Sequence, residues 1–314
     1  MKRLRKRFKK YKIKISSLNF ILVVLLVIAA FLSGMLTNKV LDLKREQDIK
    51  NQQIYNQKQQ EITLQKLQDN VVKEKYIFNI KWGDLGKKMI EDGVIDKTKF
   101  ATAITGKDEL PKDLDKYFSD GQNKIELTQA NSQFWVDILW GLGLANKNGI
   151  LEKGQMVEGG NAGNFASTGG WTIGAKQPMD IYSKYQYITL SEKQQKIVEE
   201  IAGNIYRPCC GNSTAFPDCN HGMAMLGLIE LMVSQNFSKE EIYKTALAFN
   251  VYWFPQTYLD IAYHFDKAGQ DYSKKSPKEL LSKTFSTGMA YAVIKKEVGD
   301  VQWPFLNSAG RCGA

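Results

Sequence analysis

Soft and reactive side chains gather in one stretch of this sequence, Tyr206–Met225. It holds three of the four cysteines, Cys209, Cys210 and Cys219, and one of the two histidines, His221. Cysteine thiolates attack disulfides and bind soft metals, and both reactions need the deprotonated sulfur. The stretch is therefore the candidate site, and several kinds of chemistry compete for it.

Thiol–disulfide exchange is the first interpretation, and it requires a sulfur with a lowered pKa that a partner can reach. Asp218 is a natural N-cap residue, so we expect Cys219 in the first turn of a helix, where the helix dipole stabilises a thiolate. Arg207 lies two residues before Cys209 and adds a positive charge. The candidate redox residues are Arg207, Cys209, Cys210, Cys219 and Cys312.

The fourth cysteine, Cys312, lies close to the carboxyl end between two glycines. Adjacent cysteines bridge only through a strained ring, so we expect Cys209 and Cys210 to take different partners. Cys219 and Cys312 are the available ones. Glycine-flanked Cys312 suits a docking or resolving thiol that reaches the other three. A solvent-exposed tail thiol without a role is the alternative.

A soft metal such as Cu(I) or Zn²⁺ is the second interpretation, because thiolate and imidazole are suitable ligands. The candidate ligands are Cys209, Cys210, Cys219 and His221. The alternating Cys-x-His-x-Met-x-Met series from Cys219 cannot converge on one ion if it is helical, since its members face opposite sides. A metal site would join Cys219 or His221 at the helix start to Cys209 and Cys210 from the loop.

A third interpretation is structural: disulfides staple a non-catalytic interaction domain. The four cysteines permit three complete pairings, among which the sequence does not choose. Whether the protein is an enzyme also stays open, although two histidines and no nucleophile elbow argue against a Ser-His-Asp hydrolase.

The distribution of charge and hydropathy along the chain indicates on which side of a membrane these cysteines lie. The net charge is +10, but nine basic and no acidic residues precede residue 15, which leaves +1 for the remainder. The body therefore has no basic footprint for nucleic acid. An uncharged run, Ile15–Asn38, follows, and about 20 apolar residues suffice to cross a bilayer as a helix. A cleaved signal peptide, the alternative, would have a shorter apolar region and a small-x-small cleavage site.

Basic residues cluster on the cytoplasmic side of membrane spans. We therefore predict a single-pass protein of the cell membrane with a cytoplasmic amino terminus. Residues 38–76 are polar and contain no Pro or Gly, which favours a helical stalk. The stalk lacks a seven-residue repeat, so we expect weak association at most, and the oligomeric state stays open. The predicted parts are a basic tail (1–16), a transmembrane helix (17–37), a polar stalk (38–76) and an extracytoplasmic domain (77–314).

The fold class predicted for the outer domain is mainly α. Capping signals at Ser191, Ser238 and Ser276 and helical apolar spacing over Asn131–Leu144 support it, whereas only Tyr185–Ile188 suggests a short strand. Residues 157–175 are rich in glycine and predict a long loop, which we expect to lie against the cysteine stretch. This loop lacks the Gly-Lys-Ser/Thr sequel of a phosphate-binding loop, which argues against a nucleotide.

The cysteine stretch resembles a known active-site segment. Arg207-Pro208-Cys209-Cys210-Gly211-Asn212, then Asp218-Cys219-Asn220, a helix and Asn236–Ile242 are similar to the CcmH/NrfF thiol oxidoreductases of cytochrome c maturation, which are membrane-anchored. The resemblance covers about 50 residues, with Pro-Cys-Cys in place of the family's Cys-x-x-Cys and Cys219 in place of a serine. It implies that Cys209 or Cys210 carries the thiol role. Exchange chemistry would in turn require a partner, for which a thiol-redox protein is the candidate. The whole outer domain also resembles uncharacterised membrane-anchored bacterial proteins, a similarity that implies no activity.

Overall fold

A computed structural model describes residues 17–304 and residue 306. The chain divides into two compact units, residues 1–62 and residues 63–314. Helix α1, Ser17–Val71, supplies the described part of the first unit and continues into the second.

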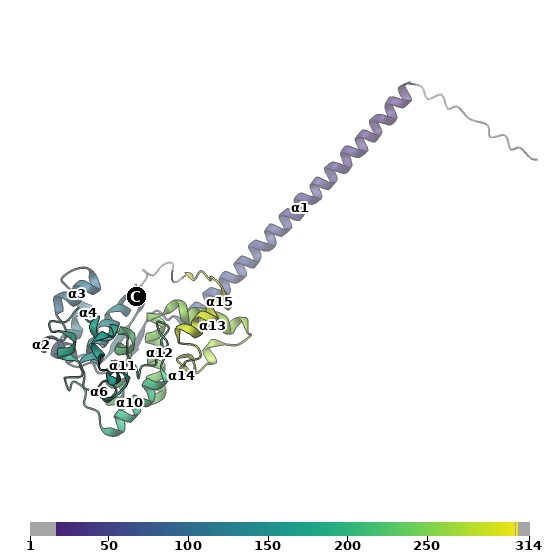
Figure 1. Cartoon of the computed structure of the whole chain (residues 1–314). Helices are drawn as coiled ribbons and strands as arrows, with labels where there is room; N and C mark the ends of the chain where they lie inside the picture. Colours follow the sequence, from purple (N-terminus) through teal and green to yellow (C-terminus); the bar gives the residue numbers. More distant parts are fainter. Residues whose placement is uncertain (1–16, 305, 307–314) are drawn as a thin grey trace, which may run out of the picture. The chain divides into compact units, whose positions relative to one another are not determined.

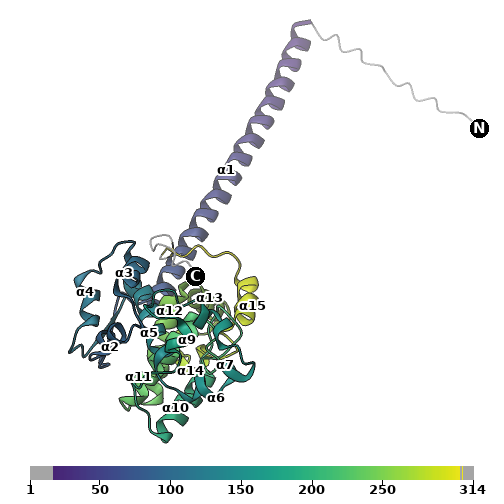
Figure 2. The ribbon, with the colours of Figure 1, turned by 60° about the vertical axis from the view of Figure 1, so that its left-hand side comes forward.

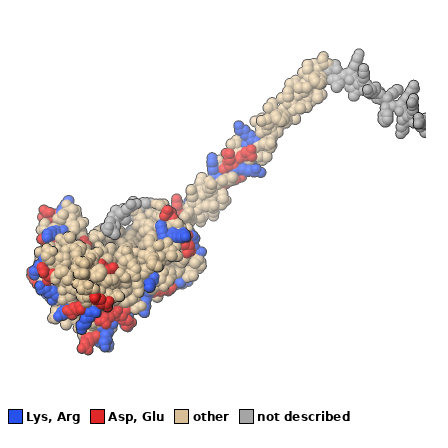
Figure 3. Space-filling model, viewed as in Figure 1, with Lys and Arg blue, Asp and Glu red and all other residues tan. Residues whose placement is uncertain are grey.

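The first unit exposes a long apolar surface. Every large apolar side chain between Leu18 and Leu36 is at least 41% exposed, and Figure 3 shows no charged residue on the helix before residue 39. The helix is long and apolar enough to cross a membrane. A soluble protein rarely leaves so large an apolar surface in water, so this stretch needs a lipid or protein environment.

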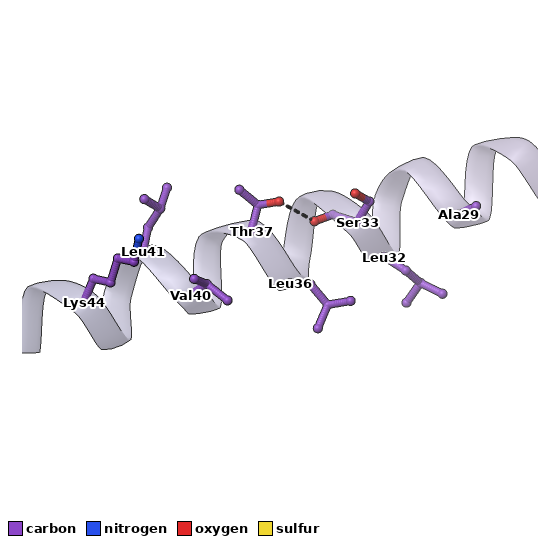
Figure 4. A pocket seen from close by; sticks show the side chains of 8 residues that line it. All are labelled: Ala29, Leu32, Ser33, Leu36, Thr37, Val40, Leu41 and Lys44. Atoms are coloured by element: carbon purple, nitrogen blue, oxygen red, sulfur yellow. Dashed lines mark hydrogen bonds between the residues drawn. The ribbon is translucent and has the colours of Figure 1, made fainter.

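A shallow hollow on this helix is open surface rather than a cavity. All the side chains that line it, from Ala29 to Lys44, belong to α1 (Figure 4). One polar contact lies within it, a 2.8 Å hydrogen bond from the Thr37 hydroxyl to the Ser33 carbonyl. Such back-bonding satisfies a hydroxyl within the helix and needs no partner from outside.

The second unit is mainly helical, as predicted. Its helices are α2 (Leu85–Glu91), α3 (Lys97–Thr105), α4 (Lys112–Asp115), α5 (Ser132–Ala145), α6 (Gly149–Lys153), α7 (Gln155–Glu158), α8 (Ala166–Gly169), α9 (Pro178–Ile181), α10 (Glu192–Asn204), α11 (Asn220–Ser234), α12 (Lys239–Trp253), α13 (Pro255–Lys267), α14 (Pro277–Leu280) and α15 (Gly288–Val298). Short 3₁₀ turns are η1 (Lys116–Phe118), η2 (Gln129–Asn131), η3 (Ala162–Asn164) and η4 (Tyr272–Lys274). Acidic and basic side chains are interspersed on the face of this unit seen in Figure 3.

The only sheet in the described residues pairs two short strands. β1 (Tyr76–Phe78) and β2 (Ile125–Leu127) run antiparallel, with Tyr76 opposite Leu127. The strand suggested for Tyr185–Ile188 is wrong, because this segment makes only an isolated bridge between Tyr185 and Asn146. Its aromatic residues are held through side chains instead: the Tyr185 and Tyr187 rings stack 5.2 Å apart, and both hydroxyls donate to Asp92.

Helices α5 and α11 form the centre of the second unit. Every residue of α5 except Gln133 is buried, as are residues 221–233 of α11. The two backbones approach so closely that a Cβ on Gly143 would lie 2.1 Å from the Met223 carbonyl oxygen. The predicted buried helix over Asn131–Leu144 is thus confirmed, shifted by one residue.

The local capping signals also decide where helices begin. Ser191 and Ser238 open α10 and α12 with complete capping boxes. Ser276 caps α14, which has Pro277 in its first turn but ends after four residues. A side-chain oxygen that accepts from the first free backbone N–H groups explains all three starts.

The glycine-rich segment 157–175 is not a structureless loop, since it contains η3 and α8. It contacts the cysteine stretch at two points. The Ser167 backbone N–H donates to the Asp218 carbonyl at 3.1 Å. The Phe165 ring packs edge-on against Phe216, with ring centroids 5.2 Å apart.

Candidate functional site

The side chain at the centre of the cysteine stretch is Arg207, only 1% exposed. Its Nε donates to the Cys219 sulfur at 2.9 Å. Its Nη1 donates to the Asn212 carbonyl at 3.1 Å, and its Nη2 donates to the Phe216 carbonyl at 3.0 Å and to Asp218 Oδ1 at 2.5 Å. A buried charge is tolerated only when it is paired and hydrogen-bonded, and all three guanidinium nitrogens have partners here.

Backbone contacts fold the stretch around this guanidinium. Tyr206 and Ser213 form an isolated antiparallel bridge, and the Thr214 N–H donates to the Ile205 carbonyl at 2.8 Å. Helix α11 then packs directly against the arginine at Gly222, where an added Cβ would lie 2.5 Å from Arg207 Cζ. The glycine therefore makes room for the guanidinium.

Cys219 is the N-cap of α11, so the predicted cap at Asp218 is wrong by one residue. Its backbone is extended, with φ −125° and ψ 165°, and its carbonyl accepts from the Met223 N–H at 3.0 Å. The Asp218 side chain turns to Arg207, which binds it more strongly than a neutral N–H would. The cysteine sulfur consequently lies at the positive end of a 15-residue helix.

The structure brings Cys209 and Cys219 together, with their sulfurs 3.5 Å apart. The Cys210 sulfur also lies within 4.8 Å of the Cys219 sulfur, at 3.9 Å from Asp218 Oδ1 and 4.0 Å from the Asn212 carbonyl oxygen. All three thiols are free, and Cys209 is the exposed one. That Cys209 and Cys210 take different disulfide partners stays a prediction, and Cys312 lies outside the described residues.

The neighbours of Cys219 lower its pKa. Hydrogen bonds from the thiols of Cys209 and Cys210 contribute most, and His221 and the charge of Arg207 add to them against the opposing effect of burial. The pKa of Cys209 is raised, chiefly by its hydrogen bonds with the thiols of Cys210 and Cys219 and then by partial desolvation. Cys219 is therefore the thiol of this cluster that ionises most readily.

The same atoms are close enough to share a soft metal. One ligand atom each from Cys209, Cys219 and His221 lie within 4.8 Å of one another, and so do atoms of Cys210, Asp218 and Cys219. Two thiolates bound to one Zn²⁺ at about 2.3 Å lie at most ~4.6 Å apart, which the 3.5 Å sulfur pair satisfies. The chain thus places three of the four predicted ligands, Cys209, Cys219 and His221, in one group.

His221 is 8% exposed, and its surroundings are aromatic. Its ring lies 4.6 Å from the ring of Phe254 and 5.6 Å from that of Trp253. These contacts fix the imidazole beside the sulfurs from the apolar side of the site.

Two contributors were missed by sequence reasoning. The Asn212 side chain donates to Asp218 Oδ2 at 2.8 Å and orients the carboxylate that binds Arg207. The Gly288 N–H at the start of α15 donates to the Cys210 carbonyl at 2.9 Å. Asn212 lies within the cysteine stretch, so its position in the sequence could have indicated its role. No sequence signal links the cysteine stretch to Gly288.

Comparisons with protein-family models, curated proteins and solved structures give no match. The chemistry of the site is therefore inferred from its own geometry: two sulfurs 3.5 Å apart, one of them exposed and the other hydrogen-bonded to a buried guanidinium.

Proposed function

We propose that the protein is a membrane-anchored thiol–disulfide exchange protein whose reacting pair is Cys209 and Cys219. The observation that supports this best is the 3.5 Å contact between the exposed Cys209 sulfur and the Cys219 sulfur, which Arg207 Nε binds at 2.9 Å. Exchange needs one accessible sulfur and one good leaving thiolate, and the pair offers both.

In the oxidised state the two sulfurs form a disulfide. A partner thiolate attacks the exposed Cys209 sulfur, a partner–Cys209 disulfide forms, and Cys219 leaves as a thiolate held by Arg207. A second partner thiol, as its thiolate, attacks the mixed disulfide, which releases the oxidised partner and Cys209. Two electrons pass from the partner dithiol to the protein, and a disulfide of a thiol-redox protein accepts them when the pair is reoxidised. Because its thiolate is stabilised, Cys219 leaves readily and the reduced state is favoured, so the pair acts as an oxidant.

The membrane topology belongs to the same proposal. The basic residues before the apolar helix keep the amino terminus in the cytoplasm and place the cysteine unit outside, where disulfides persist. Both features agree with the resemblance to the CcmH/NrfF family. A membrane-impermeant thiol reagent should label Cys209 in reduced intact cells that lack an outer barrier, and labelling only after lysis would contradict this topology.

The exchange chemistry is tested by mapping the disulfide and titrating it. Mass spectrometry of alkylated, non-reduced full-length protein should find Cys209 joined to Cys219, and a glutathione redox titration should return a two-electron midpoint. Cys219→Ser should abolish the titration, whereas Cys210→Ser, the matched control, should retain it. Linkage of Cys209 to another cysteine, or loss of the titration in Cys210→Ser, would contradict the assignment.

Soft-metal binding is the second candidate, and the grouping of Cys209, Cys219 and His221 favours it. Reduced full-length protein would then bind one equivalent of Cu(I) or Zn²⁺, and His221→Ala would weaken this binding without removing the disulfide. A structural staple, the third candidate, would instead give a disulfide that resists mild reductant. The role of Cys312 as a docking or resolving thiol stays a prediction, which the same disulfide map tests.

A further inference from the structure

Helix α15 carries an apolar stripe that the fold leaves uncovered. Met289 is 83% exposed and Val293 is 69% exposed, and Ala292 is exposed between them. The same face continues with Lys296 and Glu297, which are also exposed. Positions three and four apart share one helix face, so the exposed face is apolar near its amino end and charged near its carboxyl end.

The apolar end of this face lies at the cysteine loop. The Gly288 N–H donates to the Cys210 carbonyl at 2.9 Å, and a Cβ on Gly288 would lie 3.2 Å from the Pro208 carbonyl oxygen. These two carbonyls belong to the residues on either side of Cys209. Met289 follows Gly288 directly, so the stripe begins one residue from this contact.

The helix is held in place from its opposite side. It packs against α13, beside which it lies in both ribbon views (Figures 1 and 2). Asp260 of α13 is fully buried and accepts from the Tyr291 hydroxyl at 2.9 Å, and the Lys295 ammonium lies 3.4 Å away. The Trp303 indole donates to the same carboxylate at 2.8 Å. A stripe on a helix anchored in this way is a preformed surface that a partner meets without ordering it first.

We propose that Met289, Ala292 and Val293 form a docking surface for the thiol-bearing polypeptides that react at Cys209, namely extended chains with apolar side chains near their cysteines. This inference rests on the proposed exchange function. Exchange requires a second sulfur to reach Cys209, and a chain lying on the stripe presents its cysteine to that exposed sulfur. Methionine adapts to differently shaped side chains, which suits a surface that accepts many sequences.

Two other occupants fit the stripe less well. A stable dimer buries about 800 Å² on each partner, far more than three side chains on one helix provide. The chain's own end, residues 307–314, has no side chain larger than alanine among its apolar residues apart from Cys312. A transient contact with a passing polypeptide needs only a few apolar side chains.

The test uses the full chain in detergent and two substrates. One is a two-cysteine peptide whose cysteines are flanked by leucine and phenylalanine, and the other is reduced glutathione. Met289→Ser with Val293→Ser should lower kcat/KM for oxidation of the peptide about tenfold and leave the glutathione rate unchanged. Lys296→Ser, the control on the same face, should change neither rate. All three positions are exposed, so the thermal unfolding midpoint should stay within a few degrees, which verifies folding.

Several results would overturn the docking surface. If Met289→Ser with Val293→Ser lowers the glutathione rate as much as the peptide rate, the substitutions act on the cysteine pair and not on docking. If the peptide rate is unchanged, the stripe does not bind the peptide. Self-association that disappears in Met289→Ser with Val293→Ser would assign the stripe to a second copy. A large rise in the peptide rate on deleting residues 307–314 would assign it to the chain's own end. If the unmodified protein exchanges with neither substrate, the proposed function itself fails, which is a distinct outcome.

Discussion

Two buried ionisable side chains lie at helix α11 and differ in their hydrogen-bond partners: Arg207 packs against the helix, and Glu230 belongs to it. Arg207 is 1% exposed at the helix start, and Glu230 is 0% exposed further along the helix. The guanidinium has four hydrogen-bond acceptors, one of them the Asp218 carboxylate. Glu230 accepts a hydrogen bond from Asn146 Nδ2 at 2.9 Å through one carboxylate oxygen, and its other oxygen has no hydrogen-bond partner in the described residues.

The number of partners decides which of the two keeps its charge. Burial lowers the pKa of Arg207, but electrostatic attraction to the thiols of Cys219 and Cys210 outweighs the effect of burial, and the pKa is raised overall. Burial raises the pKa of Glu230 well above its ordinary value and outweighs the nearby amides of Asn146 and Asn148. Pairing therefore favours the charged form of Arg207 at the site, whereas burial favours the neutral form of Glu230 between α5 and α11.

The sharpest way to break this contrast is Arg207→Met. Removing one partner of a buried ion pair costs about 3–5 kcal/mol, because Asp218 loses its counter-charge. The pKa of Cys219 should also rise toward that of an ordinary thiol. Urea unfolding of the full chain in detergent and the pH profile of iodoacetamide alkylation measure the two effects. Lys244→Met removes an exposed cation, 67% accessible, and should change neither. An unaltered alkylation profile in Arg207→Met would show that the guanidinium does not tune the thiol.

The raised pKa of Glu230 predicts a pH dependence of stability. Its pKa in the folded state is raised above the ordinary 4.5, so the folded protein binds more protons than the unfolded chain. The stabilisation is complete below pH 4.5 and is lost as the pH rises, by about 1.4 kcal/mol per pH unit for one proton. Glu230→Gln should remove this slope when urea unfolding is compared at pH 5, 6 and 7.

A second buried carboxyl provides the control for that slope. Burial raises the pKa of Asp137 from 3.8 to about 7, against an opposing hydrogen bond from Gln133. Asp137→Asn should therefore flatten the profile only up to about pH 7, and the double variant should remove both contributions. A profile for Glu230→Gln that matches the unmodified protein would mean that Glu230 is charged in the folded state.

The smallest expected effect tests how tightly the guanidinium is fitted. Gly222→Ala places a methyl group 2.5 Å from Arg207 Cζ, so the arginine must shift away from Cys219. We expect a loss of about 1–3 kcal/mol, as for other overpacked sites, and a modest rise in the Cys219 pKa. Gly203→Ala, the matched control, meets nothing within 4 Å in helix α10 and should stabilise by about 0.5–1 kcal/mol. Equal effects of the two variants would contradict a fitted guanidinium.

Local signals in the sequence carried most of what could be predicted. The apolar run predicts the long first helix, and Ser191 and Ser238 start helices because their capping contacts span only three residues. The candidate site could be predicted because three of its cysteines lie within eleven consecutive residues, Cys209–Cys219. Asp218 could either cap helix α11 or pair with Arg207, and residue spacing does not decide between these roles. The sequence therefore did not predict that Arg207 is buried or that α11 has its N-cap at Cys219.

Contacts between segments far apart in the chain could not be predicted from the sequence. The 2.9 Å bond from Gly288 to the Cys210 carbonyl joins residues far apart in the chain, and the pairing of β1 with β2 does likewise. Three-residue strands carry too little alternation to be recognised. Tyr185–Ile188 was predicted as a strand and is not one. Its aromatic residues are typical of strands, but they are held by ring stacking and by hydrogen bonds to Asp92.

The site around Arg207 is built almost wholly from sixteen consecutive residues, Arg207–Gly222. Each spacing in it has a physical reason: cysteines two and three residues after the arginine, an asparagine at five, Asp-Cys at eleven and twelve, histidine at fourteen and a glycine at fifteen. Such a unit can be recognised by its spacing in a chain of any fold. A protein that keeps the arginine and glycine but loses the aspartate should bury an unpaired cation, so those three positions should change together across species.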